Sequence, residues 1–206
     1  MILVCDTTVS DRAISLRNEL LDRGYPASVS SVDEIRNHKP FCLILTFTDV
    51  FNEVRRTPYD EVFVVAVGDD FINTALNATQ AKDVTDAVSV AQNYLRESCV
   101  RDGGELFGNG VFVQPFFLAE GFFEVYSSLV IPTESEFLIF KFLLFCTQRS
   151  VYASADVIRD FCFPRKSFES NVIAAHISSL NKKISEAYGK KIIKSKRFMG
   201  YYLDKT

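Results

Sequence analysis

Basic side chains, together with amides and hydroxyls that form hydrogen bonds, gather toward the C-terminus of this chain. Residues 164–206 carry ten lysines and arginines against three acidic residues, a net charge of +7. Lysine and arginine bind phosphate oxygens, whereas amides and hydroxyls can hydrogen-bond to the edges of bases. These residue types favour a polyanionic partner that also offers base edges. The alternative is a charged surface that contacts only solvent.

Two elements would position these side chains. In residues 170–184 isoleucine and leucine recur at intervals of four, three and four, which predicts a helix with one apolar stripe (Ile173, Ile177, Leu180 and Ile184). Residues 192–203 then predict a basic β-hairpin with a glycine near its turn. A helix fits the major groove of DNA, and a hairpin can reach the neighbouring backbone or minor groove. The pair therefore indicates binding of duplex DNA.

The first half of the chain has a different character. Residues 1–103 hold 10 basic and 16 acidic side chains, and they alternate strand and helix signals. Continuous apolar runs are typical of strands buried on both faces of a parallel sheet. We expect a doubly wound α/β domain, with strands at 2–5, 27–30, 41–47 and 62–67, and helices at 10–23, 32–37 and 81–97.

The second half predicts a separate α+β domain. Arg-Asp-Gly-Gly at 101–104 is a plausible linker, and residues 106–131 predict a small antiparallel sheet. Thr133 and Glu136 have the spacing of a capping box that opens a buried helix to about residue 145. Another helix follows Ser154 and ends at residues 163–166. We expect one domain at 1–101 and another at 105–206.

Three motifs carry a resemblance to a known family. Residues 130–138 correspond to the family pattern L-T-P-T-E-F-E-L-L, and residues 173–184 to V-D-V-H-I-x-x-L-R-x-K-L. Residues 193–203 correspond to I-R-T-V-R-G-V-G-Y-R-L. On these motifs residues 105–206 resemble the winged helix-turn-helix effector domain of OmpR/PhoB-type response regulators of two-component systems. The resemblance implies a receiver-like, flavodoxin-like parallel sheet in the first half.

The chemistry of a receiver is not matched by this sequence. The resemblance aligns the aspartate that accepts the phosphoryl group with Thr46, the hydroxyl residue after the fourth strand with Ala66, and the lysine after the fifth strand with about Ala78. The acidic pair after the first strand is reduced to Asp6 followed by Thr7. A neutral threonine hydroxyl is a poor substitute for a carboxylate nucleophile. We therefore expect an atypical receiver without aspartyl phosphorylation.

The spacing supports the same interpretation. The intervals 46–66 and 68–76 are too short for full third and fourth helices, so we expect both to be shortened. Asp49 follows Thr46 by three residues, and we interpret it as a surface acid or helix cap rather than a displaced phosphoacceptor. Nothing in the sequence resembles a catalytic triad, a metal cluster or a phosphate-binding loop. We expect no enzymatic activity, no metal and no cofactor.

The resemblance also implies which residues contact DNA. Positions that meet bases align with Ala175, Ser179 and Asn181, and those that meet phosphate with Asn171, His176 and Ser178. Lys182 lies on the same face, and His176 has the alternative of packing beside the apolar stripe. Asn181 could pair with adenine and the Ala175 methyl could meet thymine, which favours A·T-leaning sites. The hairpin adds Lys190, Lys191, Lys194, Ser195, Lys196 and Arg197, the last aligned with a minor-groove arginine.

Family members bind direct-repeat half-sites as homodimers and contact RNA polymerase through the loop before the recognition helix. That loop here contains Phe163, Arg165 and Lys166, and the helix at 81–97 is the candidate dimer surface of the receiver-like domain. We expect a cytoplasmic transcriptional regulator with double-stranded DNA as its partner. The apolar runs are too short to span a membrane, and the N-terminus lacks the features of a signal peptide.

Two other functions stay open at this point: a response regulator with displaced phosphoryl chemistry, and a ligand or thiol sensor. Five cysteines are scattered along the chain without a Cys-x-x-Cys pair (Cys5, Cys42, Cys99, Cys146 and Cys162). We expect Cys5 and Cys42 to be buried and inert in core strands. Cys99, near the linker, is the candidate for an exposed thiol.

Overall fold

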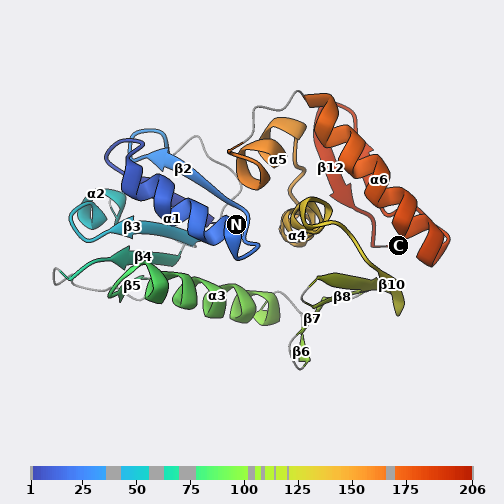
Figure 1. Ribbon diagram of the computed structural model, residues 1–206, viewed down its shortest axis with the longest axis horizontal. Coiled ribbons are helices and arrows are strands. Elements are labelled where there is room, and N and C mark those ends of the chain that lie inside the picture. Colours follow the sequence, from blue (N-terminus) through green and yellow to red (C-terminus); the bar gives the residue numbers. More distant parts are fainter. Residues whose placement is uncertain are drawn as a thin grey trace. The chain divides into compact units, whose positions relative to one another are not determined.

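The computed structural model describes residues 2–35, 43–55, 63–69, 78–101, 105–107, 110–113, 115–119, 121–165 and 170–205. The chain divides into two compact units, Met1–Tyr94 and Leu95–Thr206 (Figure 1). Helix α3 (Val84–Arg101) spans this division. Of the linker expected at 101–104, Arg101 ends α3 and residues 102–104 lie outside the described residues, so the domain boundary drawn from the sequence stays a prediction.

The first unit is built on a five-stranded parallel sheet. Its order is β2-β1-β3-β4-β5, the flavodoxin-like order, with β1 Ile2–Asp6, β2 Ala27–Ser31, β3 Leu43–Phe47, β4 Phe63–Val67 and β5 Ala78–Ala81. The apolar strands β1 and β3 are buried along their whole length. The predicted parallel sheet is confirmed, and with it the doubly wound class.

In the described part of the first unit, three helices accompany this sheet. Helix α1 (Asp11–Asp22) is capped by the Ser10 hydroxyl, which accepts a hydrogen bond from Ala13 N. It packs on β1 and β2, whereas the short α2 (Phe51–Arg55) contacts β3. Residues 32–35 form turns rather than the start of the helix expected at 32–37, and residues 36–37 are outside the described part.

The second unit joins an antiparallel sheet to helices α4 (Glu134–Gln148), α5 (Ala155–Cys162) and α6 (Ser170–Tyr188). Its strands follow one another in the order β10-β9-β8-β7-β6, with β6 Glu105–Phe107, β7 Gly110–Val113, β8 Phe116–Ala119, β9 Phe122–Val125 and β10 Ser128–Val130. The helices follow, and the hairpin of β11 (Ile193–Lys196) and β12 (Gly200–Leu203) closes the unit. This is the winged helix-turn-helix arrangement expected from the sequence.

Helix α4 lies at the centre of the second unit (Figure 1). The ring of Phe140 stacks on that of Phe123 in β9, with the ring centroids 3.7 Å apart. It meets the ring of Phe116 edge-on, with a centroid separation of 5.5 Å. The capping box is confirmed, because Thr133 Oγ1 accepts from Glu136 N and Thr133 N donates to Glu136 Oε2. No helix in the described part of the chain has the length and apolar character needed to cross a membrane.

Candidate functional site

Helix α6 presents one polar face to solvent. The predicted stripe of Ile173, Ile177, Leu180 and Ile184 is buried, with exposures of 5% or less. The opposite face is exposed at Asn171, Ala174, Ala175, Ser178 and Lys182. The ammonium of Lys182 lies 3.9 Å from the Glu186 carboxylate one turn away. The periodicity therefore placed five of the expected contact residues on the solvent side, since Ser179 is exposed as well.

Asn181 does not belong to that face. It is 8% exposed, its Nδ2 donates to Ile193 O at 2.8 Å, and its Oδ1 accepts from Ile193 N at 3.0 Å. The expectation that Asn181 pairs with adenine was wrong. Position 181 follows Ile177 by four residues and precedes Ile184 by three, so it lies on the buried edge of the helix.

Ser179 is exposed, but its hydroxyl points to another helix. Its Oγ donates to Glu136 Oε1 at 2.8 Å, and Lys183 Nζ donates to Glu136 Oε2 at 2.7 Å. Burial raises the pKa of the Glu136 carboxyl, but hydrogen bonds from Lys183, the Thr133 backbone and Ser179 outweigh it, so the pKa lies below its ordinary value. Glu136 therefore fixes α6 to the start of α4. The sequence predicted only its capping role.

The segment that follows α5 is partly packed inside the unit at Phe163. Phe163, which ends α5, is 6% exposed, and its ring stacks on His176 with centroids 5.7 Å apart. Phe163 therefore cannot serve as an exposed polymerase contact, which corrects the expectation for this loop. His176 is half-buried in this stack, as its alternative interpretation held. Arg165 is exposed, and Lys166 lies outside the described residues.

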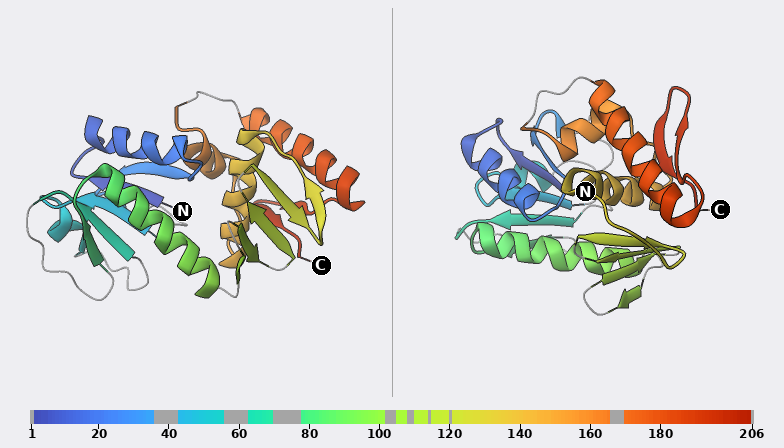
Figure 2. Two further views of the ribbon diagram at one scale, coloured as in Figure 1. Left: turned by 60° about the horizontal axis from the view of Figure 1, so that its bottom comes forward. Right: turned by 45° about the vertical axis from the view of Figure 1, so that its right-hand side comes forward.

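The β11–β12 hairpin, called the wing from here on, is held by hydrogen bonds to α6, to Ala153 and to α4, where Leu203 N donates to Thr147 Oγ1 at 2.9 Å. Beside the Asn181 contact, Ala153 and Tyr201 exchange backbone hydrogen bonds of 3.0 and 2.8 Å. Gly200 makes this approach possible, because it has φ +116 and a Cβ there would lie 2.3 Å from Ala153 O. The wing stands beside α6 in Figure 2 (right). Helix and wing are therefore fixed to each other.

The solvent side of the wing is basic. Lys196 lies over the Tyr152 ring, with Nζ 5.0 Å from its centroid, and Lys194 is half-buried. The turn contains Arg197, Phe198 and Met199, all exposed. The other exposed residues expected to contact DNA here are Lys190, Lys191, Ser195 and Lys196. Cations and hydrogen-bond donors thus border the polar face of α6.

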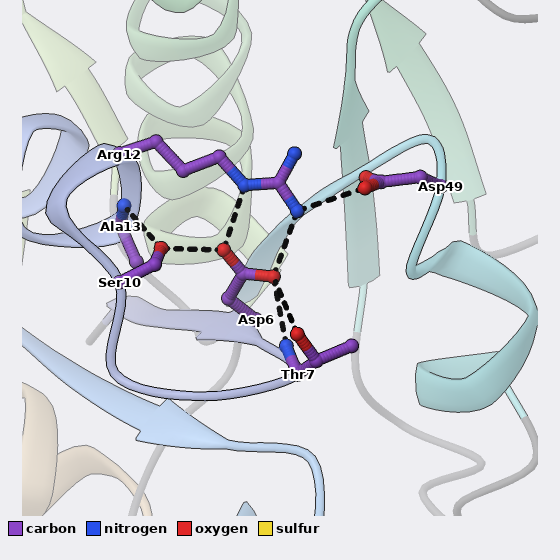
Figure 3. Close-up of polar contacts among 6 residues, drawn as sticks. All are labelled: Asp6, Thr7, Ser10, Arg12, Ala13 and Asp49. Atoms are coloured by element: carbon purple, nitrogen blue, oxygen red, sulfur yellow. Dashed lines mark hydrogen bonds and ion pairs between the residues drawn. The ribbon is translucent and has the colours of Figure 1, made fainter.

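The first unit carries a separate polar cluster at the carboxyl ends of β1 and β3 (Figure 3). Asp6 accepts from Arg12 Nε at 2.7 Å, from Arg12 Nη2 at 2.8 Å, from Thr7 N at 2.7 Å and from Ser10 Oγ at 2.5 Å. The same Arg12 Nη2 donates to Asp49 Oδ2 at 2.9 Å. The hydrogen bond from Arg12 is the main cause that lowers the pKa of Asp6 to about 2. One guanidinium thus joins the two carboxylates.

The positions aligned with receiver chemistry are placed as follows. Thr46 lies inside β3 and is fully buried, and its hydroxyl has no hydrogen-bond partner among the described residues. Ala66 is likewise buried inside β4. The alignment of the family lysine with Ala78 was wrong, because β5 runs from Ala78 to Ala81 and the residue that follows it is Lys82. The polar strand Ala-Thr-Gln-Ala lacks the apolar run that would have located it.

Asp49 is an exposed acid in the turn before α2, held by Arg12. The sequence interpretation as a surface acid is consistent with this position, but the partner was missed. Across the described residues no three acidic, histidine or cysteine side chains come together as a metal site would require. Arg12 was overlooked because nothing in its helical position signals a contact with a residue that follows β3.

The three cysteines whose side chains are described lie in the cores of the two units. Cys5, Cys146 and Cys162 are buried and free, and burial raises the pKa of Cys5 and of Cys146 to about 12. Burial also raises the pKa of Cys162. The burial of Cys5 is as expected from the sequence. Cys42 and the side chain of Cys99 lie outside the described part.

Comparison with known proteins gives similarity at the level of solved structures. The chain is similar to response regulator DrrB, a Thermotoga maritima OmpR/PhoB homolog (13% identity, 98% of each chain, TM-score 0.37). It is similar to a streptococcal redox sensor that evolved from two-component response regulators (13%, 100% of this chain and 99% of that one, 0.41). A third similar structure is the AdeR DNA-binding domain in complex with an intercistronic region (20% identity, 50% of this chain and 100% of that one, TM-score 0.38). No protein-family model and no curated protein matches the chain.

Proposed function

We propose that this protein is a sequence-specific, DNA-binding transcriptional regulator. The observation that carries the proposal is the rigid pairing of the polar face of α6 with the basic wing, through Asn181 and Ile193. A helix held at a fixed distance from a basic hairpin can enter the major groove while the hairpin contacts the adjoining backbone or minor groove. The net charge of +7 over residues 164–206 suits a phosphate-lined partner.

The exposure of these residues supports the roles proposed for them. On α6, Ala175 is proposed to contact bases and Asn171 and Ser178 to contact phosphates, with Lys182 on the same exposed face. The Ala175 methyl favours thymine, which supports A·T-leaning sites even without Asn181. On the wing, Ser195, Lys196 and Arg197 contact phosphate and the minor groove. His176 and Ser179 act indirectly, because they orient α6 through Phe163 and Glu136.

Regulation by aspartyl phosphorylation is not part of the proposal. Thr46 is buried without a partner, and the Asp6 carboxylate is already bound by Arg12. A Mg²⁺ ion would have to displace a guanidinium that makes two hydrogen bonds to Asp6 and one to Asp49. Arg12 thus supplies the positive charge that a metal supplies in a phosphorylatable site. The output of the protein would then follow its abundance.

Assembly is proposed on the same basis. The apolar edge of α3 is occupied inside the first unit at Ala87, Val88 and Ala91, so a homodimer would use the exposed side with Thr85, Asp86 and Asn93. Two copies would then bind direct-repeat half-sites in the cytoplasm. Arg165 and Lys166 are the basic residues proposed to contact RNA polymerase.

Selection from a random pool of duplexes tests the function. We expect enriched A·T-rich direct repeats, and an affinity whose logarithm falls with the logarithm of salt concentration at a slope of about −5, if about six phosphates are neutralised. Lack of any enriched sequence, together with a slope near zero, would contradict the proposal.

A second candidate function is a response regulator with displaced phosphoryl chemistry, favoured by the position of Asp49 beside Asp6 on a shared arginine. Incubation with acetyl phosphate and Mg²⁺, followed by mass analysis of the intact chain, separates the two. The main proposal expects an unmodified chain. A phosphorylated Asp49 would support the second candidate.

A further inference from the structure

The turn of the wing exposes an aromatic ring. Phe198 is 93% exposed, and Met199 beside it is 45% exposed. Removing these apolar side chains from water would be favourable. However, no other part of the described unit covers Phe198. Its ring lies beside the neighbouring Arg197, whose Cζ is 4.7 Å from the ring centroid. The packing of the wing therefore does not explain a phenylalanine here.

The backbone does not explain it either. Phe198 has φ +63, the left-handed region that glycine occupies freely and that bulky side chains avoid. The glycine of this turn instead stands at position 200, where the contact with Ala153 requires it. A strained residue with no packing role points to a function outside the fold.

The surroundings of Phe198 indicate what it meets. Lys194, Lys196 and Arg197 of the wing are cationic, and the wing is fixed to α6 through Asn181. An occupant of this tip must offer anions around an apolar interior. Stacked bases between two phosphate backbones have this chemistry, and the tip moves with the helix that we place in the adjoining groove.

We propose that Phe198 is an apolar wedge that enters the minor groove of the bound duplex, with Met199 beside it, and partly unstacks one base step. Arg197 and Lys196 hold the flanking phosphates while the duplex bends away from the wing. The proposal rests on the DNA-binding function proposed above. A flexible pyrimidine–purine step such as TA yields to a wedge at least cost, so the half-site carries one at this position.

Bending and unstacking measure the wedge separately from binding. The full chain is titrated onto a selected duplex that has fluorophores at both ends, and onto one with 2-aminopurine in the TA step. Wild type shortens the end-to-end distance and raises 2-aminopurine fluorescence. Phe198→Ala loses both signals and about tenfold in affinity, whereas its slope against salt stays unchanged, because no cation is removed.

A matched variant guards against misfolding. Phe198→Gly relieves the positive φ, so its unfolding midpoint is equal to or above that of wild type, yet it also loses both signals. Phe198→Trp keeps them. If the Phe198→Ala or Phe198→Gly protein bends the duplex as much as wild type does, the wedge proposal is wrong, whereas the proposed DNA-binding function is unaffected. If wild type binds no duplex, the proposed DNA-binding function itself is wrong.

An anionic membrane is the other surface that combines charge with an apolar interior. Vesicles of phosphatidylglycerol and phosphatidylcholine are offered to wild type and Phe198→Ala. We expect no binding that depends on Phe198. Binding that Phe198→Ala abolishes, together with an unbent duplex, would overturn the proposal.

Discussion

Asn181 of α6 and Ile193 of the wing are joined by two hydrogen bonds, of 2.8 and 3.0 Å, that use both polar atoms of the buried amide and both backbone polar groups of Ile193. The amide therefore acts as a short stretch of a partner strand. It fixes the position of the wing against α6, the two parts of the proposed DNA-binding surface.

Removal of this amide should cost both stability and affinity. Asn181→Ala leaves the Ile193 N–H and C=O buried without partners, and we expect the free energy of unfolding to fall by about 2–3 kcal/mol. Urea unfolding measures it, with the exposed Ser178→Ala as a control that changes stability by less than about 0.5 kcal/mol. An Asn181→Ala protein that unfolds like wild type and changes only its base preference would restore the adenine-reading interpretation.

Gly200 should tolerate no side chain. In Gly200→Ala the new Cβ would lie 2.3 Å from Ala153 O, so the wing must shift away from residues 153–154. We expect the free energy of unfolding to fall by more than about 2 kcal/mol, and DNA binding to weaken. Gly189→Ala is the control, because Gly189 has φ +84 but nothing within 4 Å of its Cβ. It should cost only about 1 kcal/mol. Equal losses in both would show that strain alone is responsible.

The Asp6–Arg12 pair should make the first unit resistant to acid. The pKa of Asp6 is lowered to about 2 from an ordinary value of 3.8. Its stabilising contribution is therefore complete above about pH 4 and is lost as the pH falls through 2. Because Arg12 is 45% exposed and solvent screens the pair, we expect it to contribute only about 1–2 kcal/mol to the free energy of unfolding.

Arg12→Met should remove this contribution, so that acid unfolding begins at a higher pH, as followed by circular dichroism. Arg23→Met removes an exposed pair with Glu19 and should leave the acid transition in place. A transition that does not move in Arg12→Met would mean that Asp6 is held by Ser10 and Thr7 instead.

Thr46→Val should stabilise the protein. The buried hydroxyl lacks a partner, so its replacement by a methyl group removes a desolvation cost of about 1 kcal/mol. Thermal unfolding should shift upward, and affinity for DNA should stay unchanged. If Thr46→Val instead unfolded normally but lost DNA binding, the hydroxyl would have a regulatory role that its burial argues against.

Patterns in the sequence predicted the features of this molecule that depend on residues close together in the chain. The spacing of Ile173, Ile177 and Leu180 predicted the buried stripe of α6, and Thr133 with Glu136 predicted the start of α4. The polar β5 has no apolar run, which is why Lys82 was missed as the residue after it.

Contacts between distant positions could not be predicted in this way. Arg12 reaches Asp49 from 37 residues away, and Glu136 reaches Lys183 from 47. Asn181 and Ser179 look like polar surface residues in the sequence, and only their packing partners show that their side chains are engaged inside the unit. Sequence patterns locate faces, whereas tertiary contacts decide which polar side chains remain available.

We propose that α6 and the wing bind duplex DNA as one surface. The most direct test of this proposal is the affinity of the full chain for a selected duplex, measured for wild type, for Lys196→Glu with Arg197→Glu, and for the exposed control Lys205→Glu. We predict at least a hundredfold loss for the wing variant, a salt slope reduced by about 2, and only a small change for Lys205→Glu. Equal affinities of wild type and the wing variant would contradict the account.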